Sequence, residues 1–183
     1  MGLILSKQTL ESAADALDQS LKCPDPADNP TVKEGKQPGL GTWEELFVIR
    51  ETDYGKPKNP RPGVNAEVAK IVLEVLGPED GGCATNAKRL HYHMAYLDLD
   101  SLKNPADRMY GLNNRRVAVL NGLFKAVGLD AEGMDIEDIL KPDANGDMQL
   151  KGQRVKGIVR KYTYSKSGED VKACEVDMFR PAE

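Results

Sequence analysis

The order of the predicted elements after residue 42 constrains the fold most. Three strands are predicted first, at Trp43–Glu51, Glu67–Leu76 and Lys88–Leu97, from short apolar or alternating runs. A helical stretch follows, and the chain then closes with a hairpin of two strands, Arg154–Tyr164 and Val171–Phe179. The sequence therefore predicts a mostly β fold with one principal helix between strands 3 and 4.

Three strands, a helix and two strands is the connectivity of the five-stranded oligonucleotide/oligosaccharide-binding (OB) barrel. We therefore expect residues 43–183 to form an OB-fold-like barrel that binds nucleic acid. Residues 1–42 would form a separate N-terminal part, with an amphipathic helix at Gln8–Leu21 and a proline- and glycine-rich arm behind it. That helix could pack on the barrel or on a second subunit, which leaves a homodimer open.

The principal helix has two candidate starting points. Asn104 and Pro105 have the pattern of an N-cap followed by proline at the first helical position, and a second start is possible near Asn113. An apolar stripe then leads to Gly128, a candidate C-terminal cap. A further turn of helix is predicted at Ile136–Leu140.

Charge and composition limit the partners. The net charge is −4, yet the segment 151–166 holds six basic residues and no acidic one, so a local basic strip can still contact phosphates. Apolar runs are too short to span a membrane, and the first residues do not resemble a secretion signal. The three cysteines are widely spaced, which indicates neither a zinc site nor disulfides. We expect a cytoplasmic protein.

The closing hairpin is the strongest candidate site. Arg160, Tyr162 and Tyr164 share one face of the fourth strand, with Lys156 in line and Lys166 at the tip. Cations at these positions can meet phosphates, and a tyrosine ring can stack on any base. The alternative is a solvated basic strand whose tyrosines cover the edge of the core.

A second candidate lies in the loop between the first two strands. Tyr54, Lys56 and Lys58 fall in a segment stiffened by prolines, and Arg61 follows them. In an OB barrel this loop flanks the binding face. An ordinary surface loop is an equally good interpretation of the same residues.

A third candidate is one face of the third strand, where Arg89, His91 and His93 alternate with apolar residues. Imidazoles and a guanidinium suit base stacking and phosphate contact. Two histidines at i and i+2 could also meet a metal ion, for which Asp98 or Asp100 would have to contribute.

Catalytic motifs are absent from the sequence, since it has no GxSxG, GxxxxGK[ST], HExxH or GxGxxG. The segment 143–147 has the composition of a calcium loop, but its glycine stands in the fourth place and Arg154 occupies the twelfth. A turn is the better interpretation. We expect no catalysis, no cofactor and no bound metal.

The C-terminal two-thirds of the chain resembles the single-stranded DNA-binding proteins of bacteriophages. The resemblance lies in residues 39–50, in the helix end from Leu123 to Leu129, in residues 152–164 and in residues 167–169 and 175–181. It implies an OB fold that coats single strands during replication or recombination, alongside the proteins of those processes. Stacking would rest on a small set of aromatic residues: Trp43, Tyr54, Tyr92, Tyr96, Tyr162 and Tyr164.

The sequence thus predicts a non-catalytic, largely sequence-independent single-stranded DNA-binding protein. A protein-interaction module that binds or inhibits a host protein is the first alternative. A metal-dependent enzyme built around His91 and His93 is the second. The chain departs from this family in two ways. The chain ends without a long acidic tail, and it has few aromatic residues.

Overall fold

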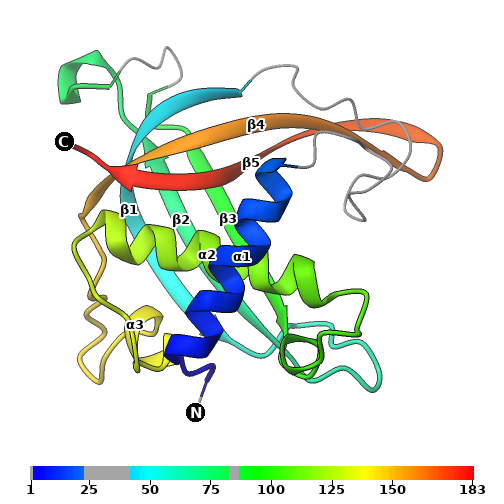
Figure 1. The fold of residues 1–183 in the computed structure, drawn as a ribbon. Coiled ribbons are helices and arrows are strands. Elements are labelled where there is room, and N and C mark those ends of the chain that lie inside the picture. Colours follow the sequence, from blue (N-terminus) through cyan, green and yellow to red (C-terminus); the bar gives the residue numbers. More distant parts are fainter. Residues whose placement is uncertain (1, 23–41, 83–86) are drawn as a thin grey trace.

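The structure is a computed structural model, and it describes residues 2–22, 42–82 and 87–183 (Figure 1). Its strands are β1 (Thr42–Gly55), β2 (Ala66–Val75), β3 (Leu90–Asp98), β4 (Arg154–Lys166) and β5 (Glu169–Pro181). Its helices are α1 (Lys7–Lys22), α2 (Tyr110–Ala126) and α3 (Ile136–Leu140). The predicted order of three strands, helix and two strands is therefore confirmed. The predicted arm at residues 23–42 falls almost entirely outside the described residues.

The five strands form one antiparallel sheet in the order β3-β2-β1-β4-β5. The sheet is open, because β3 and β5 are its two edges and do not pair in the described part of the chain. The expected closure into a barrel is therefore not found. Helix α2 contacts both edge strands instead. Its Arg116 donates from Nη1 to the carbonyl oxygen of Tyr96 at 2.6 Å, so a side chain takes up a backbone group of the β3 edge.

A β-bulge in β1 decides which side chains of this strand point inward. Ile49 pairs with Leu73 but Glu51 pairs with Val72, so Arg50 is an extra residue. An extra residue reverses the alternation of faces along a strand. Thr52 therefore points inward after the bulge and is 1% exposed.

The core lies between the inner face of the sheet and the helices. α2 contributes Leu120, Leu123 and Phe124, all fully buried. The amphipathic helix predicted at the N-terminus is confirmed as α1, which packs on α2 in front of the sheet (Figure 1). The segment before α1 is bound to the loop that leads into α3, since Leu5 donates to the carbonyl oxygen of Met134 at 2.8 Å.

The predicted helix start at Asn104 and Pro105 is wrong. α2 begins at Tyr110, and Asn104 instead accepts a hydrogen bond from the backbone N–H of Ala106 through its side chain. This is the bond that an N-cap would make, but only local turns follow it, since the backbone N–H of Asp107 donates to Asn104 and that of Tyr110 to Asp107. The end of α2 agrees with the sequence, because Gly128 has the left-handed φ of 78° that a C-terminal glycine favours.

The β4–β5 hairpin has a tight turn and extends beyond the rest of the sheet (Figure 1). Lys166 pairs with Glu169, so Ser167 and Gly168 form a two-residue turn, with φ values of 54° and 84°. Positive φ at both central residues is the geometry that matches the twist of two antiparallel strands. None of the described helices is long and apolar enough to cross a membrane.

Candidate nucleic-acid interface

The two faces of β3 are the opposite of those that the sequence analysis assigned. Ala95 and Leu97 are buried under the helices, and His91, which shares their face, is only 8% exposed. Its ring lies 5.9 Å from the ring of Phe47, and the ring of His93 meets Phe179 edge-on at 5.6 Å. Both imidazoles thus belong to the inner face, so we leave them out of the proposed surface.

Burial keeps both imidazoles neutral. Desolvation lowers the pKa of His93 to about 4, with a smaller contribution from the neighbouring His91. Desolvation also lowers the pKa of His91, helped by Arg89 and opposed by Glu45. His93 as a whole residue is half-buried, but Nε2 of each imidazole is buried and has no hydrogen-bond partner among the described residues. A buried nitrogen without a partner resists protonation.

The outer face of β3 carries exposed apolar side chains. Leu90 is 45% exposed, Tyr92 58% and Met94 63%, and we call these three residues the β3 outer patch. Among the large apolar side chains that the structure describes, Ile4 is the other exposed one. An exposed row of this kind on a soluble sheet is typical of a binding surface.

Cations border the β3 outer patch on the neighbouring strands. Lys70 of β2 stands opposite Met94, and its Nζ lies 2.9 Å from Oε1 of Glu51. Arg50, the bulge residue, holds Glu74 through two hydrogen bonds of 2.7 and 2.9 Å. These pairs raise the pKa values of Lys70 and Arg50. The cations therefore stay charged, and each is partly neutralised by a carboxylate.

The structure places only some of the residues predicted for the first loop in that loop. Tyr54 belongs to β1, points inward after the bulge and is 2% exposed. Its hydroxyl donates to Oε2 of Glu67, and burial raises its pKa, so the ring is not available for stacking. Lys56 is exposed but lies 3.4 Å from Glu67, whereas Lys58 is exposed in the loop itself.

The same loop reaches the end of β3. The guanidinium of Arg61 lies over the ring of Tyr96, 5.7 Å from its centroid. Tyr96 is on the face of Tyr92 and Met94, so the loop closes one end of the β3 outer patch. This contact joins two regions that the sequence analysis treated separately.

The β4–β5 hairpin holds the remaining predicted residues. Arg160 contacts Glu175, and its Nε lies 3.0 Å from Oδ2 of Asp177. Asp177 also binds Arg115 of α2 at 3.0 Å, so Arg160 belongs to an ion network that ties the hairpin to the helix. The positive charge of Arg160 is thus already paired with two carboxylates.

The other hairpin residues are placed as the sequence analysis expected, as far as the structure describes them. Lys156 is half-buried on β4, and Lys166 is exposed beside the turn. Tyr162 and Tyr164 lie on β4 opposite Ala173 and Val171, and their side chains fall outside the described residues. Arg89, which was predicted to contact nucleic acid, lies 3.4 Å from Glu45 near the start of β3.

Metal binding is poorly supported within the described residues. No three histidine, cysteine or carboxylate side chains there gather closely enough to hold a metal ion. The segment 143–147 is a turn, since Oδ1 of Asp143 accepts from the backbone N–H of Asn145 and of Asp147. Comparison of the chain with family models, curated proteins and solved structures gives no match.

Proposed function

We propose that the protein binds single-stranded DNA, without catalysis and largely independently of sequence, on the outer face of β2 and β3. The observation that carries this proposal is the β3 outer patch, with Tyr92 at its centre and 58% exposed. A base that stacks on an exposed aromatic ring gains about 1–3 kcal/mol, whatever its identity. Exposed Leu90 and Met94 extend the apolar surface on either side.

Cations around the patch would contact the phosphates. Lys70 lies beside the patch, and Lys58 and Arg61 lie on the loop at one end of it. Lys156 and Lys166 would continue the path along the hairpin. Contacts of this kind release counterions, so affinity should fall steeply as the salt concentration rises.

The strand order supports the same function. In an OB barrel, the face of strands 2 and 3 and the loops 1–2 and 4–5 bind oligonucleotides. On this proposal the β3 outer patch, the loop with Lys58 and the β4–β5 turn would correspond to those three places. We propose that the open sheet is a relative of that barrel and that the protein serves phage DNA replication or recombination, as the sequence resemblance implies.

A protein-interaction module remains the second candidate, because most cations near the patch are already paired. Arg50 and Lys70 are held by carboxylates, and the whole chain is acidic, with a net charge of −4. An apolar patch with neutralised cations also suits a protein partner. On that alternative the same patch would bind a host protein and not a nucleic acid.

Fluorescence anisotropy with a labelled single strand of about 30 nucleotides tests the proposal, because an OB fold covers roughly 4–16 nucleotides. We expect salt-sensitive binding that duplex of the same sequence does not displace. Tyr92→Ala should weaken binding about tenfold, and Tyr92→Phe should retain it, since the ring carries the stacking. Ile4→Ala is the matched control, because it removes an exposed apolar side chain elsewhere.

Two results would contradict the proposal. Absence of binding at low salt would remove nucleic acid as the ligand and favour the protein-interaction module. Binding that Tyr92→Ala and Ile4→Ala leave equally unchanged would show that the strand binds elsewhere on the molecule.

A further inference from the structure

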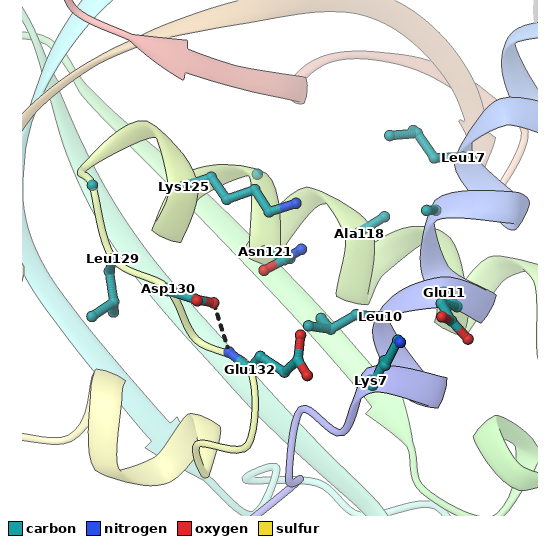
Figure 2. Close-up of a pocket in the computed structure, with 13 residues that line it drawn as sticks. Lys7, Leu10, Glu11, Leu17, Ala118, Asn121, Lys125, Leu129, Asp130 and Glu132 are labelled. Atoms are coloured by element: carbon teal, nitrogen blue, oxygen red, sulfur yellow. Dashed lines mark hydrogen bonds between the residues drawn. The ribbon is translucent and has the colours of Figure 1, made fainter.

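An open groove of about 790 Å³ lies between α1 and α2, on the side of the sheet that the helices cover (Figure 2). Its apolar lining comes mainly from small and aliphatic residues of both helices: Leu10, Ala14, Leu17, Ala118 and Gly122. Small side chains allow another helix to approach closely. The groove thus offers an apolar strip to a helix. Charged residues also line it: Lys7, Glu11, Lys125, Asp130 and Glu132.

A polar atom in the groove also lacks a partner. Asn121 lies between the two helices in Figure 2, and its Oδ1 is buried without a hydrogen bond in the described part of the chain. A buried acceptor without a donor costs about 1–3 kcal/mol. A further polypeptide over the groove could supply that donor if the Asn121 side chain turned outward, since Oδ1 itself is closed to solvent.

The exposed side of α1 carries charges in an order that complements itself. Lys7, Glu11, Ala14 and Asp18 follow one another at helical spacing, and all are exposed. If two α1 helices lie antiparallel and centred on each other, Lys7 meets Asp18 of the partner subunit, twice by symmetry. Glu11 then meets Ala14 of the partner subunit, so neither Glu11 nor Asp18 stands opposite its own copy. A parallel arrangement would set each acid against its own copy.

We propose that two copies of the chain form a symmetric dimer, in which the α1 helices pack antiparallel and each covers the groove of the other copy. A self-complementary surface is what a twofold interface requires. The two α1 and two α2 helices would form a four-helix layer between the two sheets. Lys7 and Asp18 are about 16 Å apart along α1, and this distance sets the length of the contact.

This dimer is compatible with the proposed function and does not depend on it. The groove lies on the helical side of the sheet, whereas the β3 outer patch lies on the opposite face. Both patches of a dimer would therefore remain open. Two linked sites raise the affinity for a strand long enough to reach both of them.

Analytical ultracentrifugation over a wide concentration range tests the dimer. The wild-type protein should approach about 40 kDa, twice the 20.1 kDa of one chain. Ala14→Arg should leave a monomer, because the new side chain fills the groove, and its circular dichroism should stay that of the wild type, because Ala14 is exposed and arginine favours helices.

A charge reversal tests the register. Lys7→Asp should weaken the dimer about fivefold to tenfold, since two ion pairs become repulsive. Adding Asp18→Lys should restore it, and both changes also suit the helix dipole of α1. Lys151→Glu is the matched control, because this exposed lysine lies outside the groove. A monomer at every concentration, or a dimer that Ala14→Arg and Lys7→Asp leave intact, would overturn the proposal.

Discussion

The inner and outer faces of β3 have different surroundings. On the inner face, Leu97 is fully buried and the two imidazoles pack against phenylalanine rings. On the outer face, Tyr92 and Met94 are exposed and the neighbouring cations are held by carboxylates. Stability is therefore concentrated on one face of the strand, and side chains free to bind a partner are concentrated on the other.

The largest expected effect compares two truncations on the same strand. Leu97→Ala should lower the free energy of unfolding by about 2–5 kcal/mol, because it leaves a cavity in a fully buried position. Met94→Ala, its matched control on the outer face, should cost less than about 1 kcal/mol, because Met94 is 63% exposed. Urea unfolding of both variants measures the difference. Equal losses would mean that the outer face also holds the fold together.

The second-largest expected effect is a pH dependence of stability that comes from the histidines on the inner face. In the unfolded chain, His91 and His93 become protonated below about pH 6.5. In the folded chain, burial lowers the pKa of both, and His93 becomes protonated only near pH 4. Stability should therefore decrease as the pH falls from 7 to 5. We expect the free energy of unfolding to fall by about 1–2 kcal/mol. This range is less than a fully buried imidazole would give, because His93 is half-buried.

Replacement of the histidine separates this effect from other titrations. Urea midpoints of the wild type and of His93→Leu should be compared at pH 7 and pH 5. Glu45, which acts on His91, and Glu175, which acts on His93, are present in both proteins. The variant should show a flatter dependence. If both proteins lose the same stability between these pH values, the imidazoles are not its source.

The smallest effect concerns the outer face. Glu51→Gln should free Lys70 from its carboxylate and tighten single-strand binding about twofold to fivefold, while the free energy of unfolding changes by less than about 1 kcal/mol. Anisotropy titrations at low salt measure the change. Asp138→Asn, which removes an exposed carboxylate from α3 outside the groove, should have no comparable effect. Equal gains from both variants would indicate net charge alone and not the pairing at Lys70.

The elements were predictable because their patterns are local. Alternation located β2 and β3 to within a few residues, and Gly128 marked the end of α2. Ile136–Leu140 was predicted with the bounds that the structure has. Closure of the sheet was not predictable, because it depends on whether two distant edges meet or a helix contacts both of them.

The faces were harder to predict than the strands. On β3, alternation separates Tyr92 from His91 but does not say which of them points inward, and an apolar row looked like the core. The packing of Ala95 and Leu97 under the helices decides it. On β1, one extra residue at Arg50 turns Tyr54 inward, and no local pattern announces that bulge.

The side chains that α2 directs at the edge of β3 have a consequence for solubility. Arg116 occupies the carbonyl oxygen of Tyr96, and Asn113 accepts from the backbone N–H of Asp98 at 3.3 Å. An uncovered edge strand is a template on which other chains add and aggregate. With these two side chains in place, two backbone groups that a foreign strand would need in the second half of β3 are already occupied. Helix α2 thus opposes the addition of further strands at this edge of the sheet.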